Sequence, residues 1–167
     1  TNIKPPVNIN KFINITSAED MYQAVVSNLD ENDVVIKSAA VADYKPKEYS
    51  DKKIKKKDGD LVIELDRNKD IAYEIGKIKN DKILVGFAAE TNDIIENAKA
   101  KIAKKNMDFI VANNLKESGA GFGTDTNIVS IIEKDGSMKE YPMMTKEEVA
   151  SVILDKIKTL LDNKSSL

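Results

Sequence analysis

Three short apolar runs predict the buried strands of one sheet. They cover residues 34–36, 83–87 and 109–111. Continuous apolar runs of this length are typical of parallel strands covered on both faces. Between the runs, apolar residues recur at helical spacing over residues 68–79 and 93–105. The alternation predicts an α/β fold, a Rossmann-like three-layer domain with a mostly parallel sheet.

Both ends of the chain carry helix-start signals. Residues 10–15 alternate as a strand would, and Thr16 with Glu19 fits a capping box. Strand, helix and the next strand then predict a βαβ unit with a right-handed crossover. Thr145 and Glu148 fit a second capping box, which starts a last helix. This helix is expected to bury one face: Val149, Val152, Ile153, Ile157 and Leu160.

Two β-hairpins are predicted outside the sheet strands. Residues 52–66 combine a lysine run, the turn signal Asp58-Gly59 and an alternating segment, and they predict a projecting β-ribbon. Most of its lysines are expected to be solvated edge charges. A C-terminal hairpin is expected from residues 127–133 and 138–143 around Asp135-Gly136.

Small residues follow two of the predicted strands. Ser38 and Ala39 come after the first, and Ala88 and Ala89 end the second. In open α/β sheets ligands bind beyond the carboxyl ends of the strands, so these positions predict a site there. The carboxylate of Asp43 follows closely and adds polar chemistry.

Lysine must supply the cationic chemistry of this chain. Arg67 is the only arginine, and Lys101 and Lys105 stack one helical turn apart on the 93–105 helix. A helical wheel places Lys105 close to the apolar arc and Lys101 at its edge, whereas Lys104 points away. Both could bind an anion, or extend along the surface near the helix end.

The composition excludes several classes of chemistry. The 167 residues include no His and no Cys, which excludes Ser–His triads, thiol nucleophiles, disulfides and Cys/His zinc sites. The formal net charge is −2, so neither a nucleic acid nor a membrane is an expected partner. The length suits one domain over residues 1–167.

Several motifs of different type, in order along the chain, resemble phosphopantothenoylcysteine synthetase, the ligase of coenzyme A biosynthesis. The matching segments are SAAVADYKP (38–46), KIKK (53–56), NKDI (68–71), VGFAAET (85–91), KAKIAKKNMDFIVAN (99–113) and FGTDTNIV (122–129). The resemblance implies a cytoplasmic, homodimeric enzyme that uses CTP and Mg²⁺. The carboxylate of 4′-phosphopantothenate would attack the nucleotide, and cysteine would then take the acyl group from the acyl-cytidylate.

The resemblance also implies site residues. Ser38 and Ala39 would approach the base or ribose, and Asp43 would bind the ribose–phosphate region or Mg²⁺. Lys53 would lie on a mobile flap and assist amide formation. The remaining nucleotide contacts would be Asn68, Asp70, Ile71, Phe87, Lys101 and Lys105.

The chain departs from the family at two places. Lys69 stands where the family usually has proline. The family's N-terminal glycine-rich strand–helix unit is absent, so the fragment is expected to bind nucleotide but turn over poorly. Many bacterial relatives are fused behind a flavin-dependent decarboxylase, and no flavin is expected in this fragment. Two alternatives stay open: an NAD(P)-binding oxidoreductase module, although no GxGxxG is present, and a non-catalytic dimerisation module.

Overall fold

The computed structural model describes residues 9–55, 60–90, 94–114 and 124–165. Contacts within the chain divide it into two compact units. Unit 1 comprises residues 1–28 and 40–70, and unit 2 comprises residues 29–39 and 71–167. The single domain expected over residues 1–167 remains a prediction.

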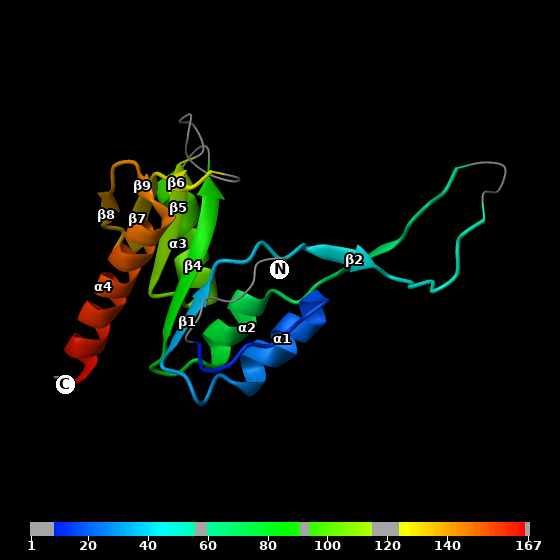
Figure 1. Ribbon diagram of the computed structural model, residues 1–167, viewed down its shortest axis with the longest axis horizontal. Helices are drawn as coiled ribbons and strands as arrows, with labels where there is room; N and C mark the ends of the chain where they lie inside the picture. Colours follow the sequence, from blue (N-terminus) through cyan, green and yellow to red (C-terminus); the bar gives the residue numbers. More distant parts are fainter. Residues whose placement is uncertain (1–8, 56–59, 91–93, 115–123, 166–167) are drawn as a thin grey trace. The chain divides into compact units, whose positions relative to one another are not determined.

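Unit 2 is built on a five-stranded sheet with the order β1-β4-β5-β7-β8. The strands are β1 (Val34–Lys37), β4 (Ile83–Glu90), β5 (Phe109–Asn114), β7 (Val129–Glu133) and β8 (Met138–Glu140). β1, β4 and β5 are parallel, whereas β7 pairs with β5 and β8 with β7 in antiparallel register. A separate short pair joins β6 (Thr126–Asn127) to β9 (Met144–Thr145). Figure 1 shows β4 and β5 side by side.

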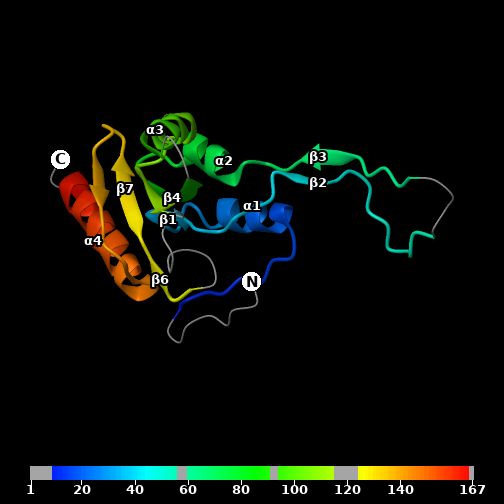
Figure 2. The ribbon, with the colours of Figure 1, turned by 90° about the horizontal axis from the view of Figure 1, so that it is seen from above.

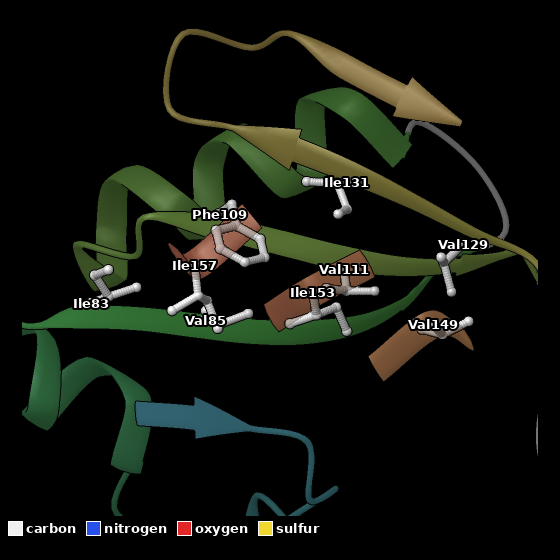
Figure 3. Packing of buried hydrophobic residues seen from close by; sticks show 9 residues of the cluster. All are labelled: Ile83, Val85, Phe109, Val111, Val129, Ile131, Val149, Ile153 and Ile157. Carbon is white, nitrogen blue, oxygen red and sulfur yellow. The ribbon is translucent and has the colours of Figure 1, made fainter. Parts of the chain in front are cut away.

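Helices cover both faces of this sheet and make the predicted three layers. α2 (Ile71–Ile78) and α3 (Ile94–Lys105) connect parallel strands and lie together on one face, whereas α4 (Lys146–Ser165) lies on the other (Figure 2). The α4 face holds a core in which side chains from α4 meet alternate residues of the strands (Figure 3). These residues are Ile83, Val85, Phe109, Val111, Val129, Ile131, Val149, Ile153 and Ile157. The mixed α/β fold with its mostly parallel central sheet is therefore confirmed.

The predicted start of α4 is also confirmed. Thr145 Oγ1 accepts a hydrogen bond from the Glu148 amide, and the Glu148 carboxylate accepts from the Thr145 amide at 2.7 Å. Gly76 and Asn106 fix the contact between the two helices on the other face. A Cβ on Gly76 would collide with the carbonyl oxygen of Lys105, and Asn106 Nδ2 donates to Gly76 O at 2.9 Å. Only glycine at position 76 allows α2 and α3 to approach this closely.

Unit 1 contains α1 (Ala18–Ser27) and a two-stranded ribbon. The predicted capping box is one residue off, because Ser17 is the N-cap and Asp20, rather than Glu19, returns to the backbone. Hydrogen bonds from the Thr16 hydroxyl and amide, followed by those from Ser17, lower the pKa of Asp20 to about 2. The strand expected at residues 10–15 was wrong: these residues form no ladder, so the predicted βαβ unit does not exist. Phe12 and Ile13 are adjacent and both exposed, which breaks the alternation on which that prediction relied.

The ribbon exists, but its ladder is short: one strand precedes the predicted range of residues 52–66 and the other lies at the end of that range. β2 (Tyr44–Pro46) pairs antiparallel with β3 (Leu65–Arg67), and Lys47 N donates to Glu64 O at 2.9 Å. The alternating residues 61–64 are in no strand, and the turn residues Asp58 and Gly59 lie outside the described part. An isolated two-stranded ribbon has no second layer to pack on, so the apolar alternation did not extend the ladder.

The start of α2 and the exposure of one of its residues differ from the sequence expectation. α2 begins at Ile71, three residues later than predicted, because the Asn68 amide and side chain bond to the base of the ribbon. Ile78 was expected to face inward, but it is 46% exposed. No helix in the described ranges is long and apolar enough to cross a membrane.

Candidate functional site

The carboxyl edge of the parallel strands is lined by small residues in unit 2. Ser38 and Ala39 follow β1 and are exposed, and Lys37 Nζ donates to Ala39 O at 3.3 Å. At the end of β4, Ala88 and Ala89 lie opposite Ala112 and Asn113 of β5. β4 therefore remains paired through its two alanines. Because the side chains at this edge are small, a ligand could approach the backbone there.

Phe87 belongs to the α4 side of the sheet. It shares a face of β4 with Ile83 and Val85 and packs, partly buried, against the core that includes α4. Of the ten candidate residues, Phe87, Ser38 and Ala39 lie near the ends of neighbouring parallel strands. The strand-end argument from the sequence pointed to Ser38 and Ala39, whereas Phe87 was a candidate only through the family resemblance.

Lys101 and Lys105 belong to α3, which covers the opposite face from Phe87. Both are half-buried, whereas Lys104 is exposed, as the helical wheel predicted. α3 starts after the carboxyl end of β4 and ends before the amino end of β5, so Lys105, in the last turn, is farther from the carboxyl edge than Lys101. The four residues between them correspond to ~6 Å along the helix axis. The structure thus places these lysines on a different face of the sheet from Phe87.

Unit 1 brings Asp43 and Asn68 together at the base of the ribbon. Asn68 N donates to Asp43 O at 2.8 Å, and Asn68 Nδ2 donates to Ala42 O at the same distance. The Asp43 side chain is exposed. Beside this junction Arg67 lies over the Tyr44 ring, 5.8 Å from its centroid. Asp43, which ends the small-residue segment, and Asn68, which precedes α2, are therefore held by direct hydrogen bonds.

The other three candidates differ in exposure. Lys53 is exposed on the segment between β2 and β3, and Asp70 is exposed immediately before α2. Ile71, by contrast, is only 3% exposed and contributes its side chain to the core of unit 2. Any contact of Ile71 with a ligand would therefore use its backbone.

A buried asparagine that the sequence reasoning missed supports the carboxyl end of β5. Asn127 is 7% exposed, and its Nδ2 donates to Asn113 Oδ1 at 3.0 Å. Its own Oδ1 accepts from the Ile128 amide at 2.9 Å. The amide group of Asn127 therefore fixes the orientation of the Asn113 side chain beside Ala89. The only sequence signal was an asparagine at each of two strand ends.

A second polar cluster lies at the opposite, amino edge of the strands. Asp108 Oδ2 accepts from Lys79 Nζ at 2.9 Å and from the Leu84 amide at 2.7 Å, and Lys134 Nζ lies 3.5 Å from Oδ1. Burial raises the pKa of Asp108, but the Leu84 hydrogen bond and the two lysines outweigh it and hold the pKa below its ordinary value. The Lys79 ammonium also donates to Lys82 O at 2.7 Å. This cluster joins the residue after α2 and the residue before β5 to β4, at the opposite edge of the sheet from the small residues.

The described residues contain no group of three acidic side chains that could hold a metal ion. Mg²⁺ characteristically keeps several waters and binds through one or two carboxylates together with substrate phosphates. The exposed carboxylate of Asp43 fits such a partial site.

Comparison with known proteins agrees with this fold. A bifunctional coenzyme A biosynthesis protein, CoaBC, of Bacillus subtilis is 52% identical over 155 residues, which are 93% of this chain and 38% of that protein. A protein described as a cysteine/cysteine sulfinic acid decarboxylase, from an unknown prokaryote, is 48% identical over 150 residues, 89% of this chain and 42% of that protein. The chain thus spans about two fifths of these relatives.

Two solved structures share the architecture. The crystal structure of the C-terminal domain of a CoaBC protein has a TM-score of 0.80 at 42% identity and covers 98% of this chain and 73% of that one. The DNA/pantothenate metabolism flavoprotein from Streptococcus pneumoniae matches the fold with a TM-score of 0.76 at 24% identity, over 94% of this chain and 76% of that one.

These matches confirm the resemblance that the ordered motifs indicated. The family model for the C-terminal domain of the DNA/pantothenate metabolism flavoprotein matches residues 1–161. The match extends over unit 1 and nearly all of unit 2. The chain therefore belongs to the DNA/pantothenate metabolism flavoprotein C-terminal domain family.

Proposed function

We propose that this chain is a phosphopantothenate–cysteine ligase of coenzyme A biosynthesis. It would join 4′-phosphopantothenate to L-cysteine and convert CTP to CMP and pyrophosphate. The observation that carries the proposal is the 52% identity to the Bacillus subtilis coenzyme A biosynthesis protein over 93% of this chain. The crystal structure of the C-terminal domain of a CoaBC protein covers 98% of the chain and supports the same assignment.

The reaction proceeds in two displacements. A carboxylate oxygen of 4′-phosphopantothenate attacks the α-phosphorus of CTP, and the bond to the pyrophosphate oxygen breaks. The cysteine amine then attacks the acyl carbon, CMP leaves with the electron pair of the carbon–oxygen bond, and the amine loses a proton to solvent. Neither step requires a His or Cys side chain, because positioned cations can stabilise the developing phosphate charge.

The nucleoside would lie at the carboxyl edge of β1 and β4. The exposed backbone at Ser38 and Ala39 has no large side chain to exclude a base or ribose. Phe87, partly buried on the α4 side, would pack against the nucleotide where β4 ends. An open edge at this place is where doubly wound folds bind nucleotides.

The segment around α2 would supply the next contacts. Asn68 and Asp70, with the backbone of Ile71, lead into α2, and the N-terminus of a helix favours phosphate. Asp43, tied to Asn68 through its carbonyl, would bind the ribose–phosphate region or one Mg²⁺ ion. That ion would neutralise charge on the triphosphate.

Three lysines would handle the phosphates and the acyl group. Lys53, on the exposed segment between β2 and β3, would close over the acyl-cytidylate. Lys101 and Lys105 would hold the triphosphate, although their face of the sheet is not that of Phe87. A nucleotide that contacts Phe87 and also Lys101 and Lys105 must therefore cross the carboxyl edge of the sheet in unit 2. Lys101, nearer that edge, would contribute more to binding than Lys105.

Thermal-shift measurements with CTP, ATP, UTP and NADPH, each with Mg²⁺, test the nucleotide site. A specific ligand at 100 times its dissociation constant adds ~2.7 kcal/mol of stability. We expect CTP to give the largest shift, and a shift with NADPH alone would refute the ligase in favour of an oxidoreductase module.

The chemistry has a separate test. Formation of the amide product is followed by mass spectrometry, and Lys53→Ala should depress it while leaving CTP binding nearly intact. A Lys53→Ala protein that forms the amide as fast as the parent would contradict the role assigned to that lysine.

We also propose that the enzyme is a cytoplasmic homodimer. The segment before β3 exposes adjacent apolar residues, with Leu61 at 68%, Val62 at 82% and Ile63 at 60%. Consecutive exposed apolar side chains on a ribbon suit an interface with a second copy. Light scattering should give twice the mass of one chain, and a Val62→Asp protein should be monomeric. A parent that scatters as a monomer would refute the dimer.

A further inference from the structure

Lys69 lies between two candidate nucleotide contacts, Asn68 and Asp70, but its side chain binds helix α1. Its Nζ is 2.9 Å from Glu19 Oε1 and lies over the Tyr22 ring, 4.2 Å from the centroid. Glu19 and Tyr22 are three residues apart on α1, so they lie on one face of the helix. All of these residues belong to unit 1. The ammonium is therefore held by a carboxylate and an aromatic face at the same time.

The acceptor on α1 is itself fixed. Gln23 Nε2 donates to Glu19 Oε1 at 2.9 Å, and this bond, followed by that from Lys69, lowers the pKa of Glu19. The capping box of Ser17 and Asp20 holds the start of α1. Lys69 thus binds a carboxylate whose position is set by two other interactions.

Asn68, the residue before Lys69, is held by the base of the ribbon. Asn68 bonds through its amide and its side chain to the carbonyls of Asp43 and Ala42, each at 2.8 Å. Residues 68 and 69 therefore connect the base of the ribbon to α1. A lysine has no ring that would restrict φ at residue 69. The two contacts of the side chain supply a restraint that the backbone of a lysine lacks.

We propose that Lys69 is a positioning residue for the nucleotide. Its contacts with Glu19 and Tyr22 hold the segment from Asn68 to Asp70 in the conformation that binds the nucleotide. Lys69 does not itself touch the phosphates, because its ammonium is directed to α1. This inference depends on the proposed function, since it assigns Asn68 and Asp70 to the nucleotide site.

The chain offers a matched control on another helix. Lys77 makes the same two contacts on α2: its Nζ is 2.8 Å from Glu74 Oε1 and 4.3 Å from the centroid of the Tyr73 ring. Both lysines are about half exposed, at 49% for Lys69 and 48% for Lys77. Lys77→Ala therefore removes the same chemistry from a place outside the proposed nucleotide site.

Calorimetric titration with CTP and Mg²⁺ tests the inference. Exposed ion pairs have modest energies, so Lys69→Ala should raise the Kd for CTP about three- to five-fold and Lys69→Glu more. Lys69→Arg should bind like the parent. The charge-exchanged pair Lys69→Glu with Glu19→Lys should recover most of the affinity that Lys69→Glu loses. Lys77→Ala should leave the Kd unchanged.

Hydrogen exchange of a peptide spanning residues 68–71, without nucleotide, separates this inference from the proposed function. Exchange should become faster in Lys69→Ala and return toward the parent rate in the charge-exchanged pair. If the parent binds CTP and both Lys69→Ala and Lys77→Ala bind it equally well, the positioning role is refuted and the nucleotide site stands. If the parent does not bind CTP, the proposed function fails and the positioning role fails with it, whatever the exchange rates show about the ion pair.

Discussion

Replacing Asp108 with alanine removes the carboxylate that neutralises a buried ammonium. The Lys79 side chain is 4% exposed, and Asp108 accepts its hydrogen bond at 2.9 Å. The same oxygen accepts from the Leu84 amide at 2.7 Å. In the variant, Lys79 retains its bond to Lys82 O, but it has lost its buried counter-charge.

The burial of this ion pair sets how much stability the Asp108→Ala substitution should cost. Removing one partner of a buried ion pair costs about 3–5 kcal/mol, because the remaining charge is left uncompensated. An unsatisfied Leu84 amide alone would cost about 1–3 kcal/mol, and the two losses overlap rather than add. We therefore expect Asp108→Ala to lower the free energy of unfolding by about 3–5 kcal/mol. Glu74→Gln breaks an exposed pair, 48% and 33% exposed, and should cost only about 0.3–0.5 kcal/mol.

Urea unfolding followed by far-UV circular dichroism at several pH values measures both variants. The pKa of Asp108 is below its ordinary value in the folded chain, so its carboxylate contributes stability above the unfolded pKa of about 3.9. That contribution is lost as the pH falls through the folded pKa. The difference between parent and Asp108→Ala should be constant near neutral pH and shrink below about pH 4.

Two outcomes would refute this reasoning. Asp108→Ala could lower the free energy of unfolding no more than Glu74→Gln does, which would mean that water or another side chain compensates the Lys79 ammonium. The difference in free energy of unfolding between the parent and Asp108→Ala could also stay constant as the pH falls below about 4. The ionised carboxylate of Asp108 would then not be the cause of the difference. Lys79→Met is a further check, because it removes the charge and retains the volume, and it should cost less than Asp108→Ala.

Three other predictions concern single side chains. Lys101→Ala should weaken CTP binding in a calorimetric titration, whereas Lys104→Ala, on the exposed face of the same helix, should bind CTP like the parent; equal affinities would argue against a triphosphate on this helix. Gly76→Ala should lower stability in thermal unfolding by about 1–3 kcal/mol, because the added methyl group overpacks the contact between α2 and α3. Helix propensity alone would instead raise stability by about 1 kcal/mol, so a more stable variant would disprove the close approach of the two helices. Asn127→Ala should cost about 1–3 kcal/mol in urea unfolding by leaving buried polar groups unpaired, and an unchanged midpoint would show that the Asn113 bond is dispensable.

The sheet could be predicted from the sequence because its strands are covered on both faces. Ile83, Val85, Phe109 and Val111 sit in apolar runs whose only favourable environment is a two-sided core, so the pattern had one interpretation. The start of α4 was equally determined, because Thr145 and Glu148 bond to each other's backbone over a local distance. Complete burial of the strands and the local bonds of Thr145 and Glu148 made these two predictions reliable.

The capping box of α1 was predicted one residue too early, and the larger errors fall where a segment has neither local capping bonds nor complete burial. Residues 10–15 have an approximate alternation but no partner strand to pair with, and residues 61–64 alternate without a layer to cover them. The amino-edge cluster joins Lys79, Leu84 and Asp108, and the Asn113–Asn127 bond joins two strand ends. Polar contacts between distant parts of the chain leave no periodic signal in the sequence.

The exposed lysines between β2 and β3 have a practical consequence for following substrate binding. Lys52, Lys53 and Lys55 are exposed and in no strand, so trypsin should cut there before it cuts the sheet. If Lys53 closes over the acyl-cytidylate, saturating substrates should slow that first cut. A gel that shows delayed digestion would then report closure of the flap without any label, in a chain that has no tryptophan to serve as an intrinsic probe.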